Sequence, residues 1–473
     1  MNWRNDLSMN MNWKQLLCEE RIPPNKNKKI QYRTEIESDY NRIITSAALR
    51  RLQDKTQVFP LDSSDFVRTR LTHSLEVASL AKFIGKQICE EIEKTEEIDT
   101  HAVLEILNCA SLLHDIGNPP FGHFGEQAIR KWFSDNLNKL EYNGIKVYDL
   151  LDEQQREDLL NYEGNAQALR IVTKLHSFNG KNGMHLTAAV LDTIIKYPVN
   201  SLEKKEEDKK LKENRKFIAK KIGYYQSEET IFQEIKQNTG TFGCRHPLTF
   251  ILEAADDLAY TFADLEDGLK KDMFTFDELL DVLESAKDEN GKKRLLEIRE
   301  EKEKMKTESG DNPVIEAIAS WLTIKQLFCV SSVKAAFMEH YDEIMSGKFD
   351  NELIACCSES EIIKKLKNFA FRKIYRDVSI LKLEIMGNEI LQFFLDKFVN
   401  AVLYFDSENY KLDAIQEKYL ALISKNHLSN YKKASDGKKD EEKIYDKLLL
   451  VADYVSGMTD GYAKRLYREL RGI

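Results

Sequence analysis

The stretch LLHDIGNPPFGHFGEQAI, residues 112–129, joins an apolar run to an adjacent imidazole and carboxylate, His114 and Asp115. Two prolines then interrupt the chain, and His123 and Glu126 follow within a single helical turn. Burying such groups without partners costs several kcal/mol, so a globular chain seldom places them after an apolar run unless they bind something. This stretch therefore predicts both a break between two helices and a binding site at that break.

The sequence around this stretch has the spacing of amphipathic helices. Apolar residues recur three and four positions apart, as in THSLEVASLAKFIGKQICEEI at 72–92. Only 8 prolines and 20 glycines interrupt the 473 residues, which favours long helices. We therefore predict an all-α protein with at most a small β-hairpin. The best candidates for extended segments are DKTQVFPL at 54–61 and GIKVYDLL at 144–151.

Residue types change along the chain near residue 300. We predict an N-terminal segment at 1–29, a helical catalytic core at 30–300 and a helical region at 301–473 that packs on the core. After about residue 300 the catalytic residue types become rare while the helical spacing continues. Two stretches of mixed charge, at 201–216 and 431–443, have little to bury, and we expect exposed loops or solvated helix ends there.

The overall charge and the cysteines exclude several classes of protein. A formal charge of -9 argues against a dedicated nucleic-acid coat or a polybasic membrane binder, because both need a positive field. The 7 cysteines form no CxxC pair, and the first residues lack the apolar core of a signal peptide. We expect no membrane span, because no run approaches the ~20 apolar residues that such a span requires. We therefore expect a cytoplasmic protein without a membrane partner.

Histidines and acids recur on the helices that flank the central stretch. The helix that contains ILNCASLL is expected to stop just after His114 and Asp115, where a glycine, an asparagine and two prolines follow. Upstream, Arg70 and His73 are three positions apart and share one helical face. This spacing supplies a second imidazole.

A third element, FILEAADDLAYTFADLEDG at 250–268, carries Asp256, Tyr260 and Asp264 at intervals of four. The three residues form a stripe along one helix that is otherwise apolar. Taken singly, each of these groups is most often a core or solvated residue. Together, two histidines and two carboxylates make a ligand set suited to Mn, Fe, Zn or Mg with open positions.

The order H…HD…D resembles the HD-domain metal phosphohydrolases. Longer blocks resemble the bacterial deoxyguanosine triphosphate triphosphohydrolase (dGTPase) family: RRLQDKTQVFPL, VRTRLTHSLEV, LLHDIGNPPFGHFGE, EGNAQALR, GYYQSEE, EAADDLAYTFADLEDG and DYVSGMTDGYA. The resemblance implies a helical HD fold and a divalent metal cofactor, Mn, Mg or Fe. The implied metal ligands are His73, His114, Asp115 and Asp256. It also implies cleavage of a deoxynucleoside triphosphate at the α-phosphorus, which releases deoxynucleoside and tripolyphosphate.

The resemblance also implies roles for individual side chains. His123 and Glu126 become an acid/base pair, and three-residue spacing on one helix puts them within hydrogen-bond reach. Arg70, Lys196, Lys221 and Asn165 would contact phosphates, although Lys220 beside Lys221 leaves that register open. The full set of implied substrate contacts is Gln57, Val58, Arg70, Asn165, Lys196, Tyr197, Lys221, Tyr260 and Asp264. Among these, Gln57, Tyr260 and Asp264 would crowd the sugar and select deoxyribose, because a clashing hydroxyl in a closed site is costly.

The resemblance also implies partners for this chain, and three alternative functions stay open. The implied partners are dGTP or another deoxynucleoside triphosphate, further copies of the chain in a homo-oligomer such as a hexamer, and single-stranded DNA as an activator. One alternative is broad specificity for deoxynucleoside triphosphates. Another is a different HD phosphodiesterase or nucleotidase, against which EGNAQ and DDLAYTFADLEDG count. A third is a nucleotide- or DNA-sensing binding module, which would have no need of a proton donor at His123.

Overall fold

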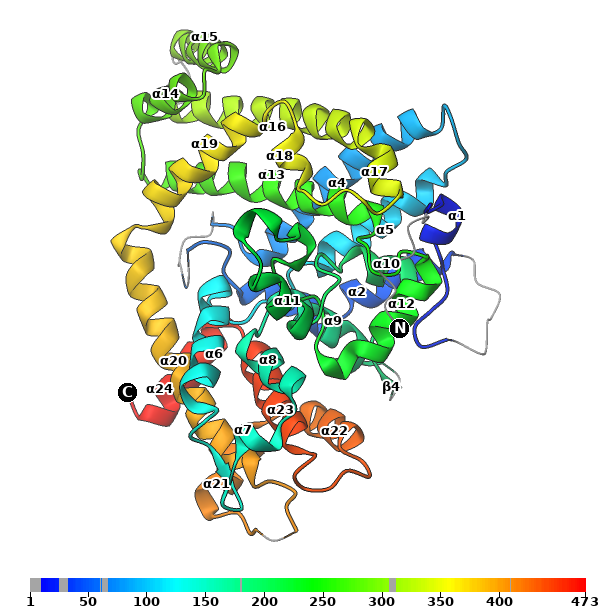
Figure 1. Ribbon diagram of the computed structural model, residues 1–473. Helices are drawn as coiled ribbons and strands as arrows, with labels where there is room; N and C mark the ends of the chain where they lie inside the picture. The colour runs from blue at the N-terminus through cyan, green and yellow to red at the C-terminus, as the bar shows by residue number, and fades with distance from the viewer. Residues whose placement is uncertain are drawn as a thin grey trace.

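The computed structural model describes residues 10–24, 33–59, 61, 67–178, 181–305, 312–408 and 410–473. These residues fold mainly into helices, which confirms the all-α prediction (Figure 1). The strands among them form two short antiparallel hairpins, β1 (Glu141–Tyr142) with β2 (Ile145–Lys146) and β3 (Ser177–Phe178) with β4 (Lys181–Asn182).

The two segments predicted to be extended, 54–61 and 144–151, have different structures. The segment 144–151 begins in the first hairpin, whose loop residues Asn143 and Gly144 have the left-handed φ that two-residue hairpin loops favour. It then turns into the short helix α7 (Val147–Leu150).

The described residues of the segment 54–61 are extended only in part and form no strand. Leu52–Asp54 form a 3-10 helix, and Thr56 makes only an isolated bridge with Thr69. Between them, Lys55 has an extended backbone and buries its side chain, whose ammonium group donates to two backbone carbonyls.

One hydrophobic core surrounds α13 (Pro247–Lys270), which is buried along most of its length. Proline at its first position and His246 as its N-cap define its start. Helices α4 (Arg70–Ile92), α5 (Thr100–Leu113) and α16 (Pro313–Glu339) pack around it (Figure 1). The other α-helices that contribute to this core or border it are α1 (Trp13–Leu16), α2 (Glu35–Ile44), α3 (Ala47–Arg51), α9 (Gly164–Arg170), α10 (Ala188–Thr193), α12 (Glu229–Thr239), α14 (Phe276–Ser285), α15 (Glu289–Met305), α17 (Tyr341–Met345), α18 (Leu353–Cys356) and α19 (Ser360–Ala370).

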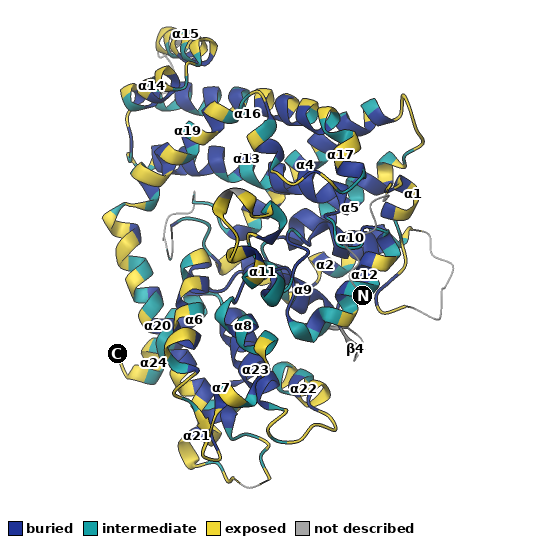
Figure 2. Cartoon of the chain, in the orientation of Figure 1, coloured by how far each residue is buried: buried dark blue, intermediate teal, exposed yellow. Residues whose placement is uncertain are grey.

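A second core joins the middle of the chain to its last part. Helix α6 (Gly122–Asn136) packs on α20 (Val378–Leu403), which packs on α23 (Ile444–Ser456). Figure 2 shows their buried faces turned toward one another below the first core. The other helices that contribute to this core or border it are α8 (Glu153–Leu160), α21 (Ala414–Leu422), α22 (Lys425–Ala434) and α24 (Asp460–Arg471). Helix α11 (Ser201–Asp208) packs on α8. The stretch 112–129 therefore crosses from one core to the other.

Helix α16 is long and apolar enough to cross a membrane by length and composition, and it is the one such helix in the described ranges. The expectation that no run approaches this length was therefore too strict. One face of α16, which includes Trp321, Val333 and Phe337, is buried in the first core against α4 and α13.

The first stretch of mixed charge is more ordered than a loop. Residues Ser201–Asp208 form α11, because Asn200 and Glu203 make a reciprocal capping box at its start. Lys205 also pairs with Glu157 of α8 at 2.7 Å. The second stretch contains the end of α22 and the turns before α23, as expected for a solvated helix end.

Candidate active site

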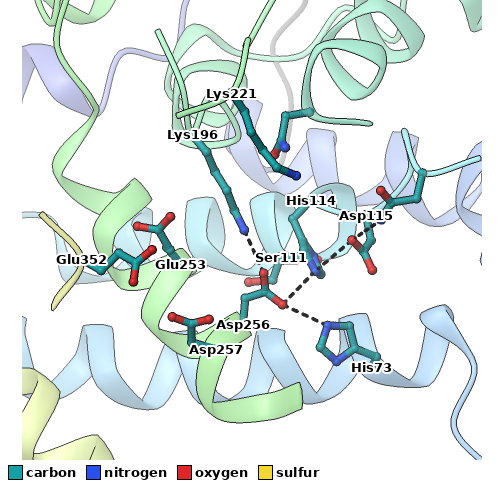
Figure 3. Close-up of polar contacts among 12 residues, drawn as sticks. His73, Ser111, His114, Asp115, Lys196, Lys221, Glu253, Asp256, Asp257 and Glu352 are labelled. Atoms are coloured by element: carbon teal, nitrogen blue, oxygen red, sulfur yellow. Dashed lines mark hydrogen bonds and ion pairs between the residues drawn. The ribbon is translucent and has the colours of Figure 1, made fainter. Parts of the chain in front are cut away.

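Three long helices bring together two of the predicted imidazoles and one predicted carboxylate (Figure 3). His73 lies in the first turn of α4, His114 is the C-cap of α5, and Asp256 lies in the middle of α13. Their potential ligand atoms all lie within 4.8 Å of one another. The Nε2 atom of His73 is 3.1 Å from Asp256 Oδ1, and that of His114 is 3.5 Å from the same oxygen.

The His114 ring is oriented by its own helix. Its Nδ1 lies 2.6 Å from the carbonyl oxygen of Ser111, which can only accept, so Nδ1 carries the proton. The buried Nε2 then presents its lone pair, and it has no hydrogen-bond partner among the described residues. A ring nitrogen fixed in this way by a backbone carbonyl is the usual arrangement of a metal-binding histidine.

The charges around this cluster favour a cation. Burial raises the pKa of Asp256, but Lys196 and His114 lower it by more, so the net pKa lies well below its usual range. Lys196 Nζ contacts Asp256 Oδ2 at 2.8 Å and leaves Oδ1 facing the two rings. Burial lowers the pKa of His114, whereas Asp115 and Asp256 raise it by more. The carboxylates therefore stabilise positive charge where the ligand atoms converge, and the donor set fits a divalent ion.

Asp115 lies at the edge of this cluster. Its Oδ1 is 3.7 Å from His114 Nε2, but it accepts a hydrogen bond from Asn118 at 2.5 Å, and Oδ2 accepts one from Arg70 at 2.5 Å. The geometry thus joins Asp115 to the predicted phosphate contact Arg70. Arg70 in turn lies against Gly122, where an added Cβ would come within 2.6 Å of the guanidinium group.

The predicted pair His123 and Glu126 forms at the start of α6, as the spacing indicated. His123 Nδ1 is 3.1 Å from Glu126 Oε2, and the two side chains are 71% and 2% exposed, respectively. Burial raises the pKa of Glu126, but the hydrogen bond and charge of His123, together with Lys221 and Arg130, lower it to about 2. Its other oxygen accepts from the backbone of Gly164 at 2.8 Å. Glu126 is therefore a fixed anion behind an accessible imidazole.

A third group, at Glu163, holds two predicted phosphate contacts. Glu163 Oε1 accepts from Lys221 Nζ at 2.8 Å and from Asn165 Nδ2 at 2.9 Å. Lys220 instead points outward and pairs with Glu352 at 3.4 Å. The geometry therefore selects Lys221 over Lys220 as the inward lysine, and Figure 3 shows it beside Lys196.

The residues expected at the sugar are more scattered. Lys367 lies over the Tyr260 ring at 5.0 Å from its centroid, and Asp264 accepts a hydrogen bond from Tyr375. Burial raises the pKa of Asp264 to about 7 although the Tyr375 hydrogen bond lowers it.

The remaining predicted contacts have different surroundings. Gln57 and Val58 are partly buried, and Gln57 Oε1 has no hydrogen-bond partner among the described residues. Tyr197 is buried next to Lys196. No hydrogen bond between described residues joins Gln57 or Val58 to the metal ligands.

Several groups that the sequence did not single out complete these sites: the backbone carbonyl of Ser111 and the side chains of Arg130, Glu163, Lys367 and Tyr375. Two of them had local signals, since Ser111 precedes His114 by three positions and Arg130 follows Glu126 by four. Lys367 and Tyr375 lie more than a hundred residues after the stripe on α13, and only the fold brings them near it.

The chain is similar to known proteins over nearly its whole length. An HD domain family model matches residues 70–192, and a phosphohydrolase-associated domain model matches residues 358–469. Proteins from Listeria innocua and Listeria monocytogenes, both called deoxyguanosinetriphosphate triphosphohydrolase-like, are each 42% identical over 98% of this chain and 100% of the relative. A protein of the same name from Synechocystis is 34% identical over the same shares.

Proposed function

The chain belongs to the family of deoxyguanosinetriphosphate triphosphohydrolase-like HD-domain proteins, and from this premise we propose that it hydrolyses deoxynucleoside triphosphates, dGTP foremost. The products would be the deoxynucleoside and inorganic tripolyphosphate. The observation that carries the proposal is the cluster of buried His73 and His114 with partly buried Asp256, together with Lys196 beside it and the accessible imidazole of His123.

A divalent ion, Mn, Mg or Fe, would be held by His73, His114 and Asp256, with Asp115 as a fourth ligand. When bound, such an ion polarises a phosphoryl oxygen and lowers the pKa of a coordinated water. For Asp115 to take part, one of its oxygens must coordinate the ion while it still accepts a hydrogen bond from Arg70 or Asn118. Each carboxylate oxygen has two lone pairs, so it can do both.

His123 is the proposed general acid. The oxygen of water forms a new bond to the α-phosphorus, the bond from phosphorus to the sugar 5′ oxygen breaks, and His123 gives its proton to that oxygen. The proton lost from water passes to solvent. Glu126 stays anionic next to Nδ1, and its contact with that nitrogen fixes the ring so that Nε2 points outward.

The cations would neutralise the triphosphate. Arg70 offers a forked guanidinium, and Lys196 and Lys221 offer point charges, each now balanced by a carboxylate of this chain. Asn165 lies beside Lys221 through their shared partner Glu163.

Sugar recognition is proposed for the stripe on α13. Tyr260 and Asp264 would contact the deoxyribose, with Gln57, Val58 and Tyr197 completing the pocket wall. The region 301–473 would contribute through Lys367 and Tyr375, which already touch this stripe or its neighbour Asp257. We also propose a cytoplasmic homo-oligomer, a hexamer by family resemblance, with single-stranded DNA as an activator.

The test is product analysis. The purified protein is incubated with Mn or Mg and each of the four deoxynucleoside triphosphates, plus GTP, and tripolyphosphate is resolved from pyrophosphate and phosphate. Tripolyphosphate from dGTP alone supports the full proposal, and tripolyphosphate from all four replaces guanine selectivity with broad specificity. Pyrophosphate, phosphate or no turnover, even with single-stranded DNA, would contradict the proposed reaction.

A further inference from the structure

Two buried charged side chains lie outside the groups described so far, at the junction between the two cores. Asp460, the first residue of α24, is 1% exposed, and Lys55 is 3% exposed. Neither takes part in the chemistry proposed above. Both contact the turn 118–121, which leads from the metal ligands to His123.

Asp460 joins two segments that are far apart in sequence. One carboxylate oxygen accepts from the backbone N–H of Phe121 at 2.9 Å. The other accepts from the backbone N–H of Thr56 at 3.0 Å and from its hydroxyl at 2.5 Å. A carboxylate is suited to this position because it accepts on both oxygens, whereas an amide of the same shape accepts on only one.

Lys55 holds the other end of the same turn. Its ammonium donates to the carbonyl of Asn118 at 2.5 Å and to the carbonyl of Ser456, at the end of α23, at 2.9 Å. Asn118 itself donates to Asp115. The turn 118–121 is thus attached at both ends to the C-terminal helices of the second core.

The backbone of this turn needs such support. Phe121 has a left-handed φ of 64°, which is unfavourable for a large side chain and persists only when the surroundings fix it. Phe121 is the N-cap of α6 but supplies no side-chain cap, and His123 follows two residues later. The hydrogen bond from Phe121 to Asp460 therefore sets the direction in which α6 starts, and with it the position of the His123 ring.

We propose that Asp460 is a positioning residue that acts through His123. It holds the left-handed turn so that the imidazole reaches the leaving oxygen, and Lys55 secures the turn's other end. This inference rests on the proposed function, because it assumes that His123 is the proton donor. It adds a requirement that a carboxylate of α24 keeps that donor in place.

The experiment is a double-mutant cycle of Asp460→Asn and His123→Ala, with kcat measured per metal-loaded folded protein. Asp460→Asn keeps the size of the side chain but turns an amide N–H toward one of the donors. We expect kcat to fall ~10-fold, since sub-ångström displacement of a catalytic group costs this order, with unchanged metal content. In the His123→Ala background the same substitution is expected to change kcat less than ~2-fold, because residues that act as a unit are not additive.

A matched control separates positioning from stability. Thr459 is the N-cap of the same helix and bonds Tyr462 N and Asp54, but not the turn 118–121. Thr459→Ala should lower the melting temperature and leave kcat unchanged. If Asp460→Asn does not fold, Thr56→Val, which removes only the hydroxyl donor to Asp460, takes its place in the cycle with an expected ~3-fold loss.

The outcomes distinguish the inference from the proposed function. Equal losses of kcat in both backgrounds, or no loss in either, would overturn the positioning role alone. Near-normal turnover of His123→Ala would contradict the proposed acid and this inference with it.

Discussion

The proposed metal-ligand cluster and the start of α6 both contain histidine, but in opposite surroundings. His73 and His114 are buried on long helices, and backbone and carboxylate contacts fix their ring nitrogens. His123 is exposed, and its position depends on a turn that distant residues hold. A metal ligand must be immobile and screened from water, whereas a proton donor must reach the leaving group and be reprotonated by solvent.

The largest expected effect tests the cluster itself. Asp256→Asn keeps the shape of the side chain but removes the charge that Lys196 and both rings face. We expect metal content, measured by mass spectrometry of the purified protein, and turnover to fall more than ~100-fold, beyond the loss of an outer-shell partner. Asp257→Asn is the matched control on the same helix, because Asp257 pairs with Lys367 instead of the rings. Full metal content in Asp256→Asn would remove Asp256 from the ligand set.

The next largest effect is expected for His123→Ala, which tests whether the start of α6 acts independently of the metal-ligand cluster. His123→Ala should leave metal content and nucleotide binding intact while turnover falls ~100-fold or more, the range for loss of an acid/base group. Metal analysis, binding of a non-hydrolysable nucleotide and single-turnover rates measure these quantities. A His123→Ala protein that loses its metal would show that the two regions are not functionally separate.

Glu126 gives a prediction for stability against pH. Its pKa lies at about 2 in the folded protein, below the ordinary 4.5, so its ionised form stabilises the fold above pH ~4.5, and this contribution is lost as pH falls toward 2. Glu126→Gln should therefore cost about 3 kcal/mol of unfolding free energy near neutral pH, and the gap from wild type should narrow below pH ~4.5. Urea unfolding from pH 7 to pH 3 measures the gap.

The control for that series is Asp135→Asn, an exposed acid of the same helix that pairs with Lys131. Its substitution should change stability little, because exposed ion pairs contribute weakly. A gap for Glu126→Gln that does not change with pH would contradict the assigned charge state.

The smallest expected effect compares two adjacent lysines. Lys221 points inward to Glu163, while Lys220 is exposed and pairs with Glu352. Lys221→Met should lower kcat/KM for a deoxynucleoside triphosphate ~10-fold, the scale of one lost charge-assisted contact, and Lys220→Met should change it little. Steady-state kinetics at fixed ionic strength measure both. Equal losses in the two variants would indicate that both lysines act only through long-range electrostatic attraction, and would contradict a specific phosphate contact by Lys221.

The sequence predicted the cluster better than the turn. Spacing of three and four on α4 and α13 and the proline break after Asp115 placed His73, His114 and Asp256 on helices, and the family resemblance joined them into one ligand set. The pair His123 and Glu126 was also visible, because both partners lie within one helical turn. Such patterns are local, and local geometry is what periodicity encodes.

The environment of the turn and of the inward lysine was not predictable in this way. Lys55 appeared as part of an extended segment, although its ammonium is buried against two carbonyls from different parts of the chain. The choice of Lys221 over Lys220 depends on Glu163, which no spacing rule links to position 221. These contacts follow from how the two cores dock, and tertiary packing overrides local propensity there.

The attachment of the turn 118–121 to α24 has a consequence for folding order. Thr56 and Asp460 are 404 residues apart in sequence, and Lys55 and Ser456 are 401 apart, so these contacts close very long loops. Closing such loops costs conformational entropy before the contacts stabilise the fold, and chains of this size fold in parts. During refolding, the helices that carry the metal ligands can therefore assemble first. The ability to bind a metal ion should return earlier than the ability to turn over substrate.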